Sequence, residues 1–404
     1  MSNVKSGWLK KFCMLSFLRY KSSTVAKKHV YGSGLVNTGS MFSNSKLRSV
    51  GGLFQFRKPT HIIYFMSKGI RRVAAGFGFS VFASSDRVYG GGVEIFSNDL
   101  HSAGYWRNGK RLVIPGFSGN IVDIAAGRRH FLVATEKKVY AFGDNAHGQC
   151  GKDPEKCPFI IPSDTSDSSV QIPSQASVKQ VHCTLDTSFV LLESGELFSF
   201  GLGTDGQLGR NGGPRDWHCL PVEGDLKGVQ VTSIKGSTDT LCAITTSGDL
   251  FMWGQNEYEQ MSPFSNQIQV LHPVEIRLRL GKISAADTTA TSSLILNSEG
   301  EVYVWGFGVV GQGPDISVLK RPVLIHPNVF SSGTDDSGKV KQIFAGNTSM
   351  FALSKHRNLY AWGINRFSHL GIGSEKDQYF PCQVVLPRPA CDLSVAPDHT
   401  LFLV

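Results

Sequence analysis

The first 85 residues of this 404-residue chain contain no acidic side chain. They carry 14 lysines and arginines before the first carboxylate, Asp86. Since the formal charge of the whole chain is +9, residues 86–404 have a formal charge of −5. The basic character therefore belongs to the amino-terminal part of the chain. The remainder lacks the excess of cations that binding to DNA or nucleosomes requires, so DNA is not among the expected partners.

Motifs of catalysis and metal binding are also absent. The eight cysteines include no C-x-x-C pair, and neither a closed zinc site nor a disulfide framework is predicted. The sequence has no G-x-S-x-G elbow, H-E-x-x-H pair or Walker loop. No apolar run approaches the roughly 20 residues that span a bilayer. We therefore predict a protein without catalytic chemistry, cofactor, metal or membrane span.

Residues 1–28 are basic, rich in serine and free of acids. This composition is typical of a mitochondrial transit peptide, and it predicts a mature chain of residues 29–404 in the mitochondrial matrix. The alternative is a secretory signal with FCMLSFL as its apolar core. That run is short for such a core and is followed closely by basic residues, which favours the transit peptide.

A short phrase recurs along the rest of the chain: a strand-like segment, a glycine and, five residues later, Gly-Gln. The copies from Val139, Leu197 and Val302 read VYAFGDNAHGQCG, LFSFGLGTDGQLG and VYVWGFGVVGQG. With weaker copies included, the strand-ending glycines are spaced by 58, 51, 58, 53, 52 and 57 residues and are Gly34, Gly92, Gly143, Gly201, Gly254, Gly306 and Gly363. A period in this range indicates a repeat architecture.

Each complete repeat also has a first half, such as IAAGRRHFLVAT from Ile124. Short runs of Val, Ile, Phe and Tyr joined by glycine turns predict strand hairpins. Small sheets of this size bury both faces by packing around an axis, which predicts an all-β, seven-bladed β-propeller. The chain ends with a first half, APDHTLFLV, and begins after the leader with a second half, HVYGSGLVNTG. We predict that residues 30–34 pair with residues 400–404, so that the N-terminal strand completes the C-terminal blade and no edge is left open.

This pattern resembles the regulator of chromosome condensation repeat, whose family forms seven-bladed propellers. The resemblance covers about residue 29 to the end of the chain. Three segments resemble the mitochondrial, exchange-factor-like members of the family: WGQNEYEQ from Trp253, VWGFGVVGQGPDI from Val304 and GIGSEKDQYFP from Gly371.

The resemblance implies a mitochondrial scaffold that supports ribosome biogenesis and translation by binding ribosome assembly proteins and ribosomal RNA. It implies a location in the matrix, with peripheral association at the inner membrane. It also implies an alternative, a guanine nucleotide exchange factor for a dynamin-related mitochondrial GTPase that acts in fusion. Exchange needs only a surface that binds the nucleotide-free GTPase more tightly than the loaded form. The leader and the acidic balance of residues 86–404 disfavour a third hypothesis, a nuclear exchange factor on chromatin.

Long segments between repeats are where binding residues are expected, because loops on a rigid scaffold concentrate binding function. Residues 97–116 and the proline-interrupted residues 150–177 are such segments. The partner-binding candidates in the first are Tyr105, Trp106, Arg107, Lys110 and Arg111. The alternative for Trp106 is packing beneath its own loop. Residues 40–72 are basic with interleaved aromatic rings, which predicts either RNA contact or the outer strands of a blade with solvated cations.

Two further features have structural rather than catalytic interpretations. GLGTDG at residues 201–206 matches a dinucleotide fingerprint, with Glu223 at the spacing of a ribose ligand. The next ten residues contain four glycines or prolines, whereas a phosphate site needs a helix N-terminus, so we interpret the segment as a turn. His130 and His399 occupy equivalent points of two repeats, which predicts hydrogen bonds inside the sheet rather than catalysis.

Overall fold

The second strand of each repeat is buried on both faces, which explains why its sequence is an almost continuous apolar run. Strands β16 (Thr240–Thr245, TLCAIT) and β20 (Ser292–Asn297, SSLILN) contain only buried residues. Such a strand needs a neighbouring sheet on each side. Covering both faces of every sheet in this way leads to a closed ring.

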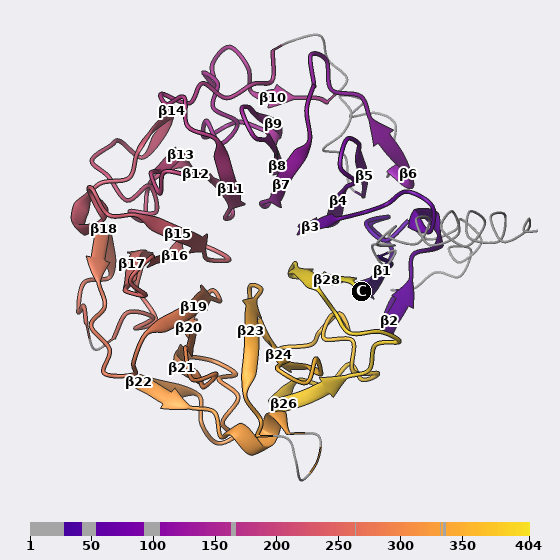
Figure 1. Ribbon diagram of the computed structural model, residues 1–404, viewed down its shortest axis with the longest axis vertical. Coiled ribbons are helices and arrows are strands. Elements are labelled where there is room, and N and C mark those ends of the chain that lie inside the picture. Colours follow the sequence, from indigo (N-terminus) through magenta and orange to yellow (C-terminus); the bar gives the residue numbers. More distant parts are fainter. Residues whose placement is uncertain are drawn as a thin grey trace, which may run out of the picture.

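The computed structural model describes residues 28–42, 54–92, 106–162, 167–262, 264–331, 333 and 337–404. Within these ranges the strands form seven four-stranded antiparallel sheets around a central axis (Figure 1). The predicted seven-bladed β-propeller is therefore confirmed.

The blades follow one another along the chain, and within each blade the strands run in order from the axis outward. The first three are β3 (Arg72–Gly76), β4 (Phe79–Ala83), β5 (Val88–Gly92) and β6 (Trp106–Leu112); β7 (Ile121–Ala126), β8 (His130–Thr135), β9 (Val139–Asp144) and β10 (Phe159–Ile160); and β11 (Val178–Cys183), β12 (Thr187–Leu192), β13 (Leu197–Leu202) and β14 (Arg215–Pro221). The next three are β15 (Val231–Lys235), β16, β17 (Leu250–Gln255) and β18 (Gln269–Glu275); β19 (Ile283–Thr288), β20, β21 (Val302–Phe307) and β22 (Val318–Leu324); and β23 (Val340–Ala345), β24 (Ser349–Ser354), β25 (Leu359–Gly363) and β26 (Gln378–Val384). Short 3-10 turns lead from an outer strand toward the next blade: η2 (Ile63–Phe65), η3 (Gly224–Leu226) and η4 (Pro327–Phe330).

The seventh blade is built from both ends of the chain. Its strands, from the axis outward, are β27 (Asp392–Val395), β28 (His399–Leu403), β1 (Val30–Leu35) and β2 (Gln55–His61). Strand β1 pairs with β28 from Val30 opposite Leu403 to Gly34 opposite His399, which confirms the predicted closure. The amino-terminal part supplies two strands, since β2 then pairs with β1.

All seven repeat glycines have a positive φ, as a sharp strand end requires: Gly34, Gly92, Gly143, Gly201, Gly254, Gly306 and Gly363. At Gly306 φ is 107°, and the strand β21 shifts register against β22 at this point. A Cβ placed on Gly306 would lie 2.5 Å from the carbonyl oxygen of Thr291 and 2.6 Å from Cα of Ser292. Only glycine satisfies both the conformation and the close approach of the neighbouring strand.

The Gly-Gln turns after these glycines are only partly equivalent. Gly206 precedes Gln207 at φ 80°, and Glu259 takes the same place before Gln260 at φ 60°, so the turn survives the loss of its glycine. The Gly-Gln at residues 311–312 is different. A Cβ on Gly311 would meet the indole of Trp362, just as one on Gly209 would meet the indole of Trp253. Gly311 therefore matches Gly209, not Gly206, and the loop after Gly306 is three residues shorter than its counterparts.

Candidate binding surfaces

Polar side chains of the innermost strands join each blade to the next near the axis. The carboxylate of Asp287 on β19 accepts a hydrogen bond from the backbone N–H of Ala345 on β23 at 2.9 Å. Asp123 on β7 accepts from the N–H of Val181 on β11 at 3.1 Å. Gln180, Ser394 and His182 make comparable bonds across other junctions. These side chains satisfy backbone groups that the curved inner edge of the ring leaves unpaired.

The same side chains line a cavity of about 180 Å³ on the axis, which the innermost strands of all seven blades surround. Burial raises the pKa of Asp287 to about 6, although the ammonium of Lys235 and backbone N–H groups oppose the rise. Burial lowers the pKa of His182 to about 3, and Lys235 acts in the same direction. Desolvation thus dominates at the axis, which is the behaviour of structural groups held away from water.

Two histidines join neighbouring blades through serine hydroxyls. Nε2 of His130 on β8 lies 3.0 Å from Oγ of Ser188 on β12, and Nε2 of His399 on β28 lies 2.7 Å from Oγ of Ser80 on β4. The predicted structural hydrogen bonds are therefore present. They run between adjacent sheets, however, and not inside one sheet, because side chains alternate along a strand and both histidines lie on the face that packs against the next blade.

In the second contact, Ser80, His399 and Asp398 are hydrogen-bonded in the same sequence as the serine, histidine and aspartate of a catalytic triad. Nδ1 of His399 lies 3.0 Å from Oδ1 of Asp398, while its Nε2 faces the hydroxyl of Ser80. A catalytic serine must meet its substrate, as in Ser-His-Asp hydrolases. Ser80 and His399 have no exposed surface, so a substrate cannot reach the hydroxyl. The arrangement instead fastens the seventh blade to the first.

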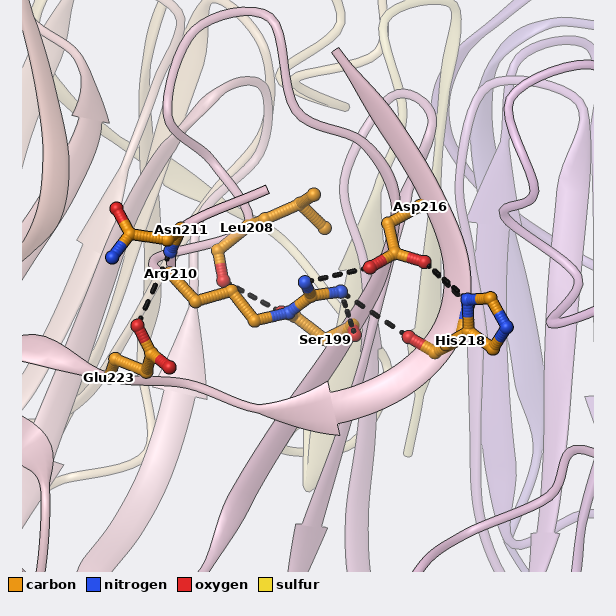
Figure 2. Close-up of polar contacts among 7 residues, drawn as sticks. All are labelled: Ser199, Leu208, Arg210, Asn211, Asp216, His218 and Glu223. Carbon is orange, nitrogen blue, oxygen red and sulfur yellow. Dashed lines mark hydrogen bonds and ion pairs between the residues drawn. The ribbon is translucent and has the colours of Figure 1, made fainter. Parts of the chain in front are cut away.

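A buried arginine that the sequence did not reveal holds the loop between β13 and β14 (Figure 2). Nη1 of Arg210 donates to Asp216 at 2.9 Å, and Nη2 donates to the carbonyl oxygens of Ser199 and His218, both at 3.3 Å. Burial alone would raise the pKa of Asp216, but hydrogen bonds from the backbone and ring of His218 and from Arg210 lower it below its usual value. The guanidinium is almost completely buried, so its role is to order the loop.

The dinucleotide fingerprint lies in the same loop. Gly201 is the penultimate residue of strand β13, and the residues after the strand form turns that lead into β14, not a helix. Glu223 accepts a hydrogen bond from the backbone N–H of Asn211 at 3.3 Å (Figure 2). This loop therefore lacks the helix N-terminus on which a pyrophosphate would rest.

The partner-binding candidates lie mostly on an outer strand. Trp106, Arg107, Lys110 and Arg111 belong to β6, which was expected to be a loop, and Tyr105 lies outside the described residues. The strand pairs with β5, with Lys110 opposite Gly90 and Arg111 opposite Tyr89. Lys110 and Arg111 are exposed. The interpretation of residues 97–116 as one long loop is thus wrong for the second half of that segment.

Beside β6 lies a cluster of aromatic rings from the segment that precedes β3. The ring of Phe42 stacks on Tyr64 with centroids 5.3 Å apart, and Gly109 of β6 packs directly on Phe42. The ammonium of Lys68 lies 4.5 Å from the ring centroid of Tyr64, within the range of a cation–π contact. Of the two alternatives for residues 40–72, the structure confirms an outer strand, β2; contact with RNA stays a prediction.

We call this region the basic side of the ring. It consists of exposed or half-buried cations on two neighbouring blades and the connection between them, which are Lys58, Lys68, Arg71, Lys110 and Arg111. In Figure 1 the outer strands β2 and β6 lie at the lower and upper right of the ring, on neighbouring blades. On such a surface the lysines and arginines are able to bind phosphates, and the exposed aromatic rings beside them are able to stack on bases.

The second long segment, residues 150–177, completes a blade. Strand β10 is only two residues long, and beyond it Ser168 accepts a hydrogen bond from the N–H of Ala141 at 3.0 Å. Val170 donates to the carbonyl of Val139 at 2.8 Å and is buried. These described residues of the segment therefore cover the edge of β9, which is a structural role.

Comparison with known proteins identifies the repeat. Residues 121–149 and 358–403 match the regulator of chromosome condensation (RCC1) repeat. The crystal structure of human WBSCR16 superposes with a TM-score of 0.83 at 28% identity, covering 93% of this chain and 98% of that one. The structure of Prp20p from Saccharomyces cerevisiae shares the fold, with a TM-score of 0.75 at 17% identity over 94% of this chain and 92% of that one. The chain therefore contains RCC1 repeats and has the seven-bladed propeller fold of these structures.

In sequence the chain is similar to the RCC1-like G exchanging factor-like protein of Homo sapiens. The two are 33% identical over 290 residues, which are 70% of this chain and 61% of the human protein. The mouse protein of the same name is 32% identical over 292 residues, 70% of this chain and 62% of the relative. The matched part thus spans about three fifths of the length of these curated relatives.

Membrane-spanning helices and metal clusters are both missing from the part of the chain that the structure describes. No helix among these residues is long and apolar enough to cross a membrane. Across the same ranges, no group of three or more His, Cys, Asp or Glu side chains is arranged to hold a metal ion.

Proposed function

We propose that this chain is a non-enzymatic scaffold of the mitochondrial matrix that supports ribosome biogenesis and translation, binding ribosomal RNA and assembly proteins. The observation that carries the proposal is the basic side. Its cations come from two neighbouring blades and their connection, and one of them, Lys68, lies over the ring of Tyr64, an arrangement suited to phosphates and bases. The acid-free leader motivates the mitochondrial location and removal of about residues 1–28. Contact with the inner membrane would be peripheral.

An RNA-binding measurement tests the proposal. The triple variant Lys58→Glu, Arg71→Glu, Arg111→Glu should bind mitochondrial ribosomal RNA at least about tenfold more weakly than wild type, with a shallower dependence on salt. The matched control is Lys227→Glu, Lys341→Glu, Lys355→Glu, which makes the same change of net charge at exposed sites on other blades. Equal affinities for the two triple variants would contradict a role of the basic side. An intact Met1 in the organellar protein would contradict import with processing.

A second candidate function is nucleotide exchange on a mitochondrial GTPase of the dynamin-related class. It is favoured by the similarity to a G exchanging factor-like protein. The expected signature is faster release of a fluorescent GDP analogue from the GTPase and retention of the GTPase only without nucleotide. Recovery of partners from mitochondria with and without RNase separates the two functions, because the scaffold's ribosomal partners should be lost with RNase.

A further inference from the structure

An apolar strip lies on outer strands and loops of consecutive blades, away from the basic side. We define it as Tyr258, Phe307, Ile316, Val318 and Phe380, each of which exposes between 40% and 54% of its surface. In Figure 1 the strand β22 lies across the ring from β6. Isolated exposed apolar residues are common on proteins, so the question is whether these five form one surface.

Contacts show that the strip is continuous. The rings of Tyr258 and Phe307 stack with centroids 6.0 Å apart, although they belong to neighbouring blades. Phe307 is directly opposite Val318 in the pairing of β21 with β22, so both side chains are on one face.

The strip continues into a third blade. The N–H of Ile316 donates to the carbonyl of Gly313, and a Cβ on Gly313 would lie 3.1 Å from Cζ of Phe380 on β26. The loop therefore connects the apolar residues of β22 to those of β26. A contiguous apolar surface across several elements is typical of a protein interaction site.

The short loop after Gly306 exposes the centre of the strip. In the other blades that retain the turn, the loop after the repeat glycine ends at a buried residue that lies three positions further along the chain, as Leu208 does after Gly201. Here the buried residue is Val310, only four positions after Gly306. Among the described residues, the buried indole N–H groups of Trp305 and Trp362 have no hydrogen-bond partner, whereas that of Trp253 donates to the carbonyl of Gln207.

The charges of the strip indicate the chemistry of its partner. Residues 257–259 and 314–320, which border the strip's side chains in the fourth and fifth blades, contain three carboxylates and one ammonium. Lys320 is already paired with Glu259 at 3.2 Å. Glu257 and Asp315 are the remaining, exposed carboxylates. A complementary partner therefore carries apolar side chains flanked by cations.

We propose that this apolar strip is a docking site for a protein segment that presents an apolar face between lysines or arginines, such as a basic amphipathic helix. The site supplies the protein-binding half of the scaffold proposed above and rests on that function. It uses different blades from the basic side, so the two surfaces are able to hold RNA and protein at once.

Peptide binding to the purified full-length chain tests this proposal. The probe is a fluorescent peptide of about 14 residues with leucine and lysine at helical spacing, and its counterpart has glutamate for lysine. The lysine peptide should bind to wild type, and the double variant Phe307→Ser, Val318→Ser should bind it at least about tenfold more weakly. The double variant Glu257→Lys, Asp315→Lys should have a lower affinity for the lysine peptide and a higher affinity for the glutamate peptide than wild type. The control Val113→Ser, Val385→Ser removes two valines that are 67% and 78% exposed elsewhere and should change nothing.

Three results would overturn the proposal. The first is that the double variant Phe307→Ser, Val318→Ser binds the lysine peptide as tightly as wild type does. The second is that wild type binds both peptides equally well. The third is that wild type self-associates and this double variant does not. The last result would assign the strip to a second copy of the chain. Lys58→Glu, Arg71→Glu, Arg111→Glu should leave peptide binding intact, so failure of the RNA proposal remains distinguishable from failure of this one.

Discussion

Charged and titratable side chains serve different purposes at the axis and at the outer edge of the ring. At the axis, Asp287 accepts hydrogen bonds from the next blade, and burial raises its pKa to about 6. Away from the blade junctions, Lys58 and Arg111 on the outer strands β2 and β6 are exposed, and so is Arg71 in the connection that leads to β3. The axial groups are committed to joining blades, whereas the outer ones are accessible to partners. A charged residue in this fold is therefore a functional candidate only if it lies outside the blade junctions.

Removing the closing strand should have the largest effect on this arrangement. Deletion of residues 29–39 takes away β1, so β28 loses its partner and β2 loses its attachment. Open strand edges template association, so we expect loss of the cooperative unfolding transition and aggregation. Size-exclusion chromatography with thermal unfolding measures both. A chain that lacks only residues 1–27 is the control and should melt as wild type; a monomeric deletion mutant with an unchanged melting temperature would refute the closure.

The next largest effect is expected at a repeat glycine. Gly306→Val places a β-branched residue at φ 107° and against the backbone of Thr291 and Ser292, which should cost about 3 kcal/mol or more of unfolding free energy. Denaturant unfolding checks this value. The control is Gly333→Val, where no described atom lies within 4 Å of the added Cβ. Similar losses in the two variants would remove the conformational explanation of the repeat.

A smaller effect, which depends on pH, is expected at the junction of β8 and β12. Burial, assisted by Arg128, lowers the pKa of His130 to about 3. Between about pH 3 and 6.5 the unfolded chain binds a proton here that the folded chain does not, so stability falls as the pH falls through this window. Each pH unit corresponds to about 1.4 kcal/mol at most. His130→Gln should flatten this part of the stability profile.

The axial carboxylate of Asp287 should make stability depend on pH in the opposite direction. Because the pKa of Asp287 is raised from 3.8 to about 6, the folded chain keeps a proton that the unfolded chain loses, and stability falls as the pH rises between these values. Asp287→Asn should remove that fall. Unfolding measured from pH 3 to 7 compares both variants with wild type. Identical profiles for all three proteins would show that these buried groups do not titrate as described.

Much of the fold was predictable because the repeat is encoded by local backbone requirements. Gly143 and Gly201 mark strand ends in the sequence, and the half-repeats at the two ends of the chain predicted the pairing of β1 with β28. The short loop after Gly306 escaped prediction because Gly311 and Gln312 imitate the usual turn in register. The residues of the loops after Gly201 and Gly306 do not themselves show that Gly209 packs on the indole of Trp253 and Gly311 on that of Trp362.

The binding surfaces were harder to predict than the fold. Lys110 and Arg111 were identified as candidates, but they were assigned to a loop because the distance from β5 to β6 concealed their pairing. The apolar strip was missed, since Tyr258, Phe307 and Phe380 are far apart in sequence and meet only when three blades are placed side by side. Arg210 was missed for a different reason: its partners are near in sequence, but the curvature of one loop decides which groups the guanidinium reaches.

The division between axis and outer edge is tested most directly by one paired measurement of ribosomal RNA affinity and unfolding free energy. Asp287→Ala leaves the N–H groups of Ala345 and Thr288 without their acceptor, so it should cost about 1–3 kcal/mol of stability and leave RNA affinity unchanged. Lys58→Glu, Arg71→Glu, Arg111→Glu should change stability by no more than about 0.5 kcal/mol and weaken RNA binding at least about tenfold. The reverse pattern, with RNA affinity lost in Asp287→Ala and kept in the triple variant, would contradict the account.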